Sequence, residues 1–158
     1  MPVVLCRVDE RLIHGQVVIG WGHELRPDRY VVVDDEIADT PWEQELYALG
    51  APEAATTFFA LQGARTDFEA WCVDPARTVI LTRTIRTMRL LLDGQSSNQA
   101  VNLGGLHASP ERARVLDYLH LSRADREDLS EMAAQGVAVS ARDLPDAVDV
   151  DLETLLAT

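Results

Sequence analysis

The chain has 158 residues, of which 47% are hydrophobic, and carries a formal net charge of −12 at pH 7. This length and apolar content are typical of one domain with a sizeable core, so we expect residues 1–158 to form a single domain. The acidic balance argues against nucleic-acid binding. No run approaches the roughly 18 to 20 apolar residues of a membrane helix, and no secretion signal is evident, so the sequence predicts a cytoplasmic protein.

Short apolar runs bounded by polar residues recur along the chain and are typical of buried strands. They are Val3 to Val8, Tyr30 to Val33, Thr56 to Leu61, Thr78 to Thr82, Ala100 to Leu103 and Gly136 to Ser140. Segments with helical spacing lie between and after them: Gln16 to Leu25, Pro41 to Leu49, Thr66 to Cys72, Ile85 to Leu92, Ser122 to Gln135 and a short one at Leu152 to Leu156. This alternation predicts an α/β fold, with a mostly parallel sheet, helices on both faces, and function in the loops after strands.

Two helix starts carry capping signals. Thr40 and Ser122 are each followed three residues later by an acidic residue, Glu43 and Asp125 respectively. Both pairs are consistent with a capping box or its acidic variant.

Cysteines and histidines show no metal-binding or disulfide spacing. Cys6 and Cys72 are far apart in the sequence and are interpreted as core thiols. The chain's four histidines likewise lack zinc spacing, so we expect no metal and no other cofactor.

His14 lies where the first strand turns into a helix. A phosphoryl group there would meet free backbone N–H groups and the positive end of the helix dipole, and Gly15 would let the backbone approach. Arg11 can add a charge-assisted clamp, and Asp9 can orient the imidazole through its second nitrogen. An imidazole is a usable nucleophile at neutral pH. On spacing alone, a cap or a satisfied core histidine stays a competing interpretation.

The segment from Arg7 to Val18, RVDERLIHGQVV, with Trp21 following, resembles the phosphorylation-site segment of the mannose/fructose/sorbose family of IIB components. These proteins belong to the phosphoenolpyruvate-dependent sugar phosphotransferase system (PTS). Similar segments fall at Val31 to Asp35, at Asn102 to His107 and at Leu119 to Pro145, so the resemblance spans nearly the whole chain.

The resemblance implies a largely parallel sheet of about seven strands and a phosphocarrier function. His14 would accept a phosphoryl group, by the family's pattern on Nδ1, from a IIA component. It would pass that group to an incoming sugar with membrane IIC and IID partners, so the sugar is reached only indirectly. Arg11 and Asp9 would be active-site neighbours, with Gly15 and Gln16 in the same loop. A homodimer is compatible with this pattern.

A glycine-rich loop, Asn102 to His107, follows the fifth strand. Asn102, Gly104, Gly105 and His107 are candidates to line the same site. For His107 we favour an alternative, in which its ring bonds a backbone carbonyl and fixes the loop. His23 and His120 are interpreted as structural or surface residues.

Two further polar pairs follow strands. Asp34 and Asp35 resemble the acidic pair of a receiver domain, but that architecture normally needs a lysine and the chain has none, so we interpret them as strand-ending residues of which one caps a helix. Arg83 and Arg86 are interpreted as solvated, with reception of a donor's acidic face as the alternative.

Two other functions stay open on the sequence. One is a regulatory module whose phosphorylation state selects its protein partners, without sugar transport. The other is a non-catalytic binding module that keeps the loop by descent, in which His14 is never phosphorylated.

Overall fold

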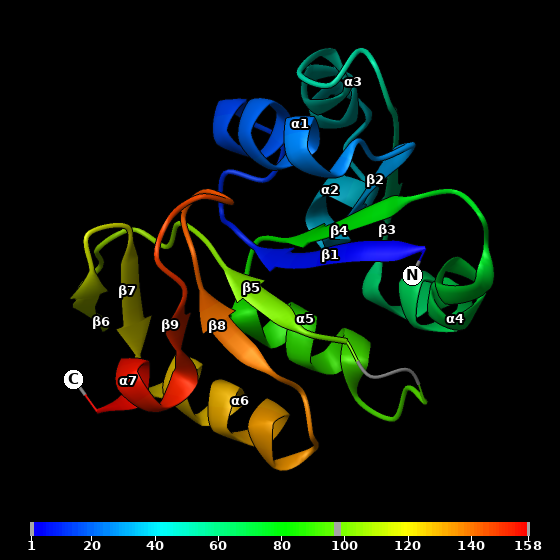
Figure 1. Ribbon diagram of the computed structural model, residues 1–158. Coiled ribbons are helices and arrows are strands. Elements are labelled where there is room, and N and C mark those ends of the chain that lie inside the picture. The colour runs from blue at the N-terminus through cyan, green and yellow to red at the C-terminus, as the bar shows by residue number, and fades with distance from the viewer. Residues whose placement is uncertain (1, 97–98, 158) are drawn as a thin grey trace.

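A computed structural model describes residues 2–96 and 99–157 (Figure 1). Its strands are β1 (Val3–Val8), β2 (Arg29–Val33), β3 (Ala55–Phe59), β4 (Thr78–Thr82), β5 (Val101–Leu103), β6 (Arg112–Leu116), β7 (Leu119–Ser122), β8 (Val139–Ala141) and β9 (Val150–Asp151). Its helices are η1 (Gln16–Trp21), α1 (Gly22–Leu25), α2 (Asp35–Ala38), α3 (Pro41–Leu49), α4 (Leu61–Val73), α5 (Ile85–Leu92), α6 (Arg123–Ala134) and α7 (Leu152–Leu156).

A seven-stranded sheet, in the order β3-β2-β4-β1-β5-β8-β9, forms the centre of the molecule. Its first six strands pair in parallel, and only β9 runs antiparallel to its neighbour. Strands β2 and β4 are almost entirely buried, as expected of strands that are covered on both faces. The predicted α/β fold with a mostly parallel sheet is therefore confirmed.

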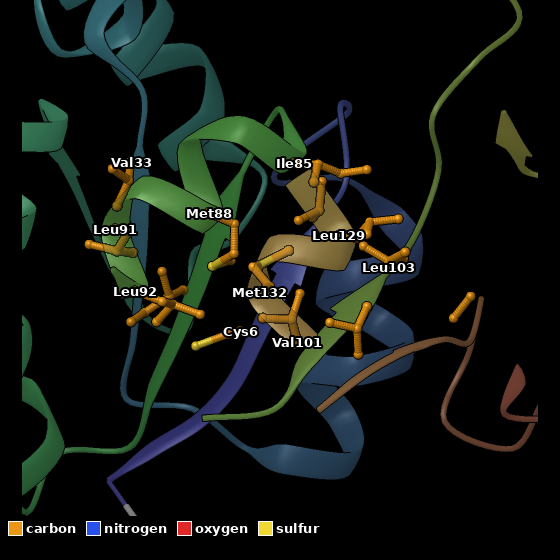
Figure 2. Close-up of a cluster of buried hydrophobic side chains, with 14 of the residues drawn as sticks. Cys6, Val33, Ile85, Met88, Leu91, Leu92, Val101, Leu103, Leu129 and Met132 are labelled. Carbon is orange, nitrogen blue, oxygen red and sulfur yellow. The ribbon is translucent and has the colours of Figure 1, made fainter. Parts of the chain in front are cut away.

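Helices cover both faces of this sheet, and each face has its own apolar core. Alternate residues of one strand divide between them: Val31 and Val33 of β2 enter the core under α4, α5 and α6, whereas Tyr30 and Val32 enter the core under η1, α2 and α3. Figure 2 shows Cys6 of β1 in the first core, with Met88 of α5 and Met132 of α6.

Some element boundaries differ from those predicted. Strand β3 ends at Phe59 and α4 begins at Leu61, because Ala64, Phe68 and Trp71 recur at helical spacing and are all buried. Strand β8 begins at Val139, three residues later than expected. The β6–β7 hairpin and the antiparallel strand β9 were not predicted; the exposed β6 residues Ala113 and Arg114 give no apolar run.

The capping predictions had different outcomes. Ser122 and Asp125 form the expected capping box at α6, and Asp34 caps α2 by accepting from the backbone N–H of Ile37 at 3.0 Å. The prediction for Thr40 was wrong: its hydroxyl donates back to the Glu36 carbonyl at 2.7 Å and makes no cap bond.

Candidate phosphorylation site

The loop from Asp9 to Gly15 leaves the carboxyl end of the central strand β1. It leads into η1, which packs on one face of the sheet, whereas β4 beside β1 leads into α5 on the other face. Neighbouring strands whose connections leave in opposite directions open a crevice at their carboxyl ends, where ligands bind in folds of this type. His14 therefore lies at the expected edge of the sheet.

Leu12 sets the conformation of this loop. Its backbone is left-handed, with a φ of 53°, which is unusual for a residue with a branched side chain. Burial of its side chain offsets this strain, and its N–H donates to the Asp9 carbonyl at 2.9 Å. Its own carbonyl oxygen is thereby placed 2.9 Å from Nδ1 of His14.

The His14 ring is held between the Leu12 carbonyl and the Asp9 carboxylate. Its Nε2 lies 3.8 Å from Oδ2 of Asp9 and is buried without a hydrogen-bond partner. Because a carbonyl only accepts, Nδ1 carries a proton in this conformation. A phosphoryl group on Nδ1 would replace that proton, so phosphorylation at Nδ1 requires the ring to leave Leu12.

Asp9 is the buried centre of the charge cluster around His14. Its carboxylate accepts from Nη2 of Arg7 at 3.2 Å, and from the backbone N–H and Nε of Arg11 at 3.1 and 3.3 Å. Arg7 is fully buried, whereas 45% of the Arg11 side chain is exposed. Nη2 of Arg11 also donates to Gln16 at 2.7 Å. The cluster therefore presents the half-exposed guanidinium of Arg11 near His14, while the buried Arg7 neutralises the charge of Asp9.

Arg7 is enclosed by segments from both ends of the chain. Its guanidinium donates to the side-chain oxygen of Asn102, to the Arg142 carbonyl at 2.8 Å and to the Asp143 carbonyl at 3.1 Å. Its Cζ lies 5.2 Å from the ring centroid of Trp21, which is a cation–π contact. Burial lowers the pKa of Arg7, and the nearby Asp9 charge opposes this shift.

The glycine-rich loop lies against the same cluster, as the sequence suggested. A Cβ on Gly104 would lie 2.5 Å from Cζ of Arg7 and 2.6 Å from Oδ2 of Asp9, so only glycine fits there without movement. A Cβ on Gly105 would lie 3.1 Å from Nη2 of Arg11. At Gly15, by contrast, a Cβ would meet nothing within 4 Å, so no protein atom requires glycine at that position.

His107 differs from the favoured expectation. Its ring does not bond a backbone carbonyl; Nδ1 and the backbone N–H both bond the Glu10 carboxylate, and 74% of the side chain is exposed. Together with Arg11, Gln16 and Tyr118 it lines a groove of about 330 Å³ beside the loop. Burial raises the pKa of the Tyr118 hydroxyl.

Sequence reasoning missed much of the support beneath the site. Arg7 was part of the family-like segment but was given no role. It lies on β1 two residues before Asp9, the first residue after the strand, and residues two apart along an extended chain point to the same side. The carbonyls of Arg142 and Asp143, which accept from Arg7, could not be predicted, because every residue has a backbone carbonyl and no residue type marks these two as acceptors.

The remaining polar candidates have structural partners. Asp34 lies 3.3 Å from Nε of Arg83, and Asp35 accepts from the Leu61 backbone at 2.8 Å. Arg86 pairs with Asp128 at 3.2 Å. Within residues 2–96 and 99–157, no three His, Cys, Asp or Glu side chains gather as metal ligands, and no helix is long and apolar enough to cross a bilayer.

Comparison with known proteins identifies the family. The chain matches the model of the PTS system sorbose subfamily IIB component over residues 3–158. The N-acetylgalactosamine-specific phosphotransferase enzyme IIB component 1 of Escherichia coli K12 is 28% identical over 145 residues, covering 90% of this chain and 91% of that protein. The mannose-specific EIIAB component of the same strain is 26% identical over 156 residues, covering 90% of this chain and 44% of that protein.

Solved structures agree with this assignment. The crystal structure of the E. coli N-acetylgalactosamine-specific IIB component 1 superimposes with a TM-score of 0.88 at 27% identity, covering 95% of this chain and 99% of that one. The IIB domain of the Klebsiella pneumoniae sorbose permease gives 0.90 at 21% identity, covering 100% of this chain and 98% of that one, which supports the fold. The chain therefore belongs to the sorbose subfamily of PTS IIB components and is a phosphotransferase component of a sugar-uptake system.

Proposed function

We propose that His14 accepts a phosphoryl group from a phosphohistidine of a IIA component and passes it to a sugar bound by membrane IIC and IID partners. The observation that carries this proposal is the arrangement of His14 beside the paired Asp9 and Arg11 at the carboxyl end of β1. The E. coli relative whose name joins EIIA and EIIB supports a IIA donor.

In the first transfer, a P–N bond forms at His14 while the donor's P–N bond breaks, and the donor imidazole keeps the electron pair of the broken bond. Nucleophilic attack needs a ring nitrogen with a lone pair. In the conformation described above the proton is on Nδ1; once the ring leaves Leu12, Asp9, 3.8 Å from Nε2, favours transfer of that proton to Nε2, and this leaves the lone pair on Nδ1. The ring must exchange its contact with the Leu12 carbonyl for the phosphorus atom.

Arg11 supplies the positive charge that the transferred group requires. Its half-exposed guanidinium already reaches toward Gln16 and solvent, so it can turn to the equatorial phosphoryl oxygens while Arg7 continues to neutralise Asp9. The backbone N–H groups of Gln16 and Val17, at the start of η1, are further donors to the phosphoryl group, whereas that of Val18 already donates to the His14 carbonyl at 2.9 Å. In the second transfer, a P–O bond to the sugar hydroxyl forms, the P–N bond breaks, and the hydroxyl proton balances the returning electron pair on the imidazole.

Intact-mass analysis tests the proposal. Wild type, His14→Ala and the control His120→Ala are incubated with phosphoenolpyruvate, the general PTS phosphocarriers and a mannose-type IIA component. We expect one acid-labile phosphoryl mass on wild type and His120→Ala, and none on His14→Ala. Phosphorus–nitrogen coupling in NMR spectra of the ¹⁵N-labelled product then identifies the ring nitrogen, for which we expect Nδ1. An unmodified wild type beside its own phosphorylated IIA partner would refute the carrier function.

A second assay separates transport from regulation. Phosphorylated protein is mixed with membranes that contain the IIC and IID components of its own cell and with radiolabelled sugars. Formation of a sugar phosphate supports transport, whereas a stable phosphoprotein with no discharge supports the regulatory alternative.

A further inference from the structure

Two helices toward the same end of the molecule, α3 and η1, carry four exposed apolar side chains (Figure 1). Trp42, Leu46 and Leu49 of α3 are 67%, 61% and 77% exposed, and Ile19 of η1 is 75% exposed. We call these four residues the α3 face. Three of them lie on one helix, and exposed apolar side chains grouped in this way mark interaction sites more often than single exposed ones do.

The apolar stripe on α3 is not needed to hold the helix in place. Trp42, Leu46 and Leu49 recur at positions i, i+4 and i+7, so they share one side of the helix. The helix is attached by other residues: Tyr47 packs on the second core, and the Gln44 amide donates to the Ile37 and Ala38 carbonyls at 2.8 and 3.1 Å. The stripe is therefore free to contact another molecule.

The α3 face adjoins the phosphorylation loop. Gly50, directly after α3, lies so close to Ile13 that an added Cβ would be 3.3 Å from the Ile13 side chain, and Ile13 directly precedes His14. From Ala51 and Pro52 an open groove of about 680 Å³ runs to Ile19. A partner that reaches His14 from this side would therefore cover the α3 face.

The acidic residues near the α3 face indicate the charge of the partner that would bind there. Glu43 and Glu45 lie on α3. Glu53 lines the groove together with two basic side chains, Arg26 and His23. A second copy of this chain would bring the same acidic groups together, and anionic lipid headgroups would repel them. Cytoplasmic loops of membrane proteins, in contrast, carry an excess of lysine and arginine.

We propose that the α3 face docks the basic cytoplasmic loops of the membrane component that receives the phosphoryl group, with Trp42 as the central apolar anchor. This inference rests on the proposed function, because it assigns one surface to the discharge step. The proposal assigns the α3 face to discharge alone, so substitutions there should impair discharge and leave phosphorylation by the IIA donor unchanged.

The test measures both transfers on full-length protein. Trp42→Ala combined with Leu46→Ser removes the apolar contact, and Glu45→Arg reverses one charge. Val73→Ser and Glu153→Arg are matched controls, because Val73 is 80% exposed and Glu153 is exposed on α7, at the opposite end of the molecule from α3 (Figure 1). One assay follows phosphorylation by IIA; the other follows discharge to sugar in inside-out vesicles that carry the IIC and IID components of the same cell.

We expect the double variant to raise the KM for discharge to these vesicles at least about tenfold, which corresponds to a loss of about 1.4 kcal/mol. Glu45→Arg should raise the KM for discharge severalfold and make this KM less sensitive to salt concentration. Phosphorylation by IIA should stay within about twofold of wild type for every variant, and both controls should behave as wild type.

Several results would overturn the inference. Normal discharge by the double variant would show that the face is no interface, and an equal defect in both transfers would make it a donor or folding surface. Loss of a dimer in the double variant, seen by light scattering, would assign the face to self-association. A phosphorylated wild type that never discharges to sugar would defeat the transport step of the proposed function itself, and the inference with it.

Discussion

Gly104→Ala should destabilise the fold through the site itself. Gly104 does not have a positive φ, so the effect is steric and not a matter of backbone conformation. The new methyl group would lie 2.5 Å from Cζ of Arg7 and 2.6 Å from Oδ2 of Asp9, about 1 Å inside van der Waals contact. Arg7 cannot retreat, because Asn102, the Asp143 carbonyl and Trp21 enclose it.

The size of the effect follows from what must move. Overpacking alone costs about 1–3 kcal/mol, and separation of a buried ion pair costs about 3–5 kcal/mol. We expect the free energy of unfolding to fall by about 3 kcal/mol, together with slower phosphorylation of His14 because Asp9 is displaced.

Urea denaturation followed by tryptophan fluorescence measures this effect. Gly63→Ala is the control: it lies in α4, where a Cβ meets only the Phe59 ring at 3.7 Å, so the same substitution should stabilise by about 0.5–1 kcal/mol. A Gly104→Ala protein as stable as wild type, phosphorylated at the normal rate, would refute the packing described for Arg7 and Asp9.

Three further substitutions have defined outcomes. Burial raises the pKa of Cys6 to about 12, so unfolding between about pH 9 and 12 releases a proton from this thiol. The free energy of unfolding therefore falls as the pH rises through that window, by up to about 1.4 kcal/mol per pH unit. Cys6→Ala should reduce this slope in urea denaturation measured from pH 8 to 10. Asp128→Ala leaves Arg89, 2.7 Å from that carboxylate, without its acceptor and should lower stability by about 2 kcal/mol by thermal unfolding. Arg11→Lys keeps the charge but loses the paired hydrogen bonds from Nε and Nη2 to the Asp9 carboxylate. Phosphorylation of His14 should therefore slow at least tenfold in a single-turnover assay, while the melting temperature barely changes.

The sheet, and the place of the candidate site within it, could be predicted because both depend on local patterns. Apolar runs such as Thr78–Thr82 specify strands that are buried on both faces, and the turn from Val8 to Gln16 places His14 at a carboxyl edge whatever the details of packing.

Other features could not be predicted, because they depend on burial, on contacts between loops or on a competing local hydrogen bond. The left-handed conformation of Leu12 is imposed by its burial and by the Asp9 carbonyl, whereas its residue type disfavours that conformation. The bond from His107 to Glu10 required knowing that two loops meet at the edge of the sheet, and Thr40 satisfied its hydroxyl locally instead of capping a helix.

The acceptors of Arg7 give the protein an order of assembly. Its three hydrogen-bond acceptors outside the loop lie at sequence separations of 95, 135 and 136, so most of the chain must be brought together before these bonds can form. During synthesis, a nascent chain that has not yet delivered Asp143 holds the complete His14 segment without the support beneath it. If His14 is the phosphoryl acceptor, incomplete products of translation should therefore accept phosphoryl groups poorly, and only complete chains should be phosphorylated efficiently.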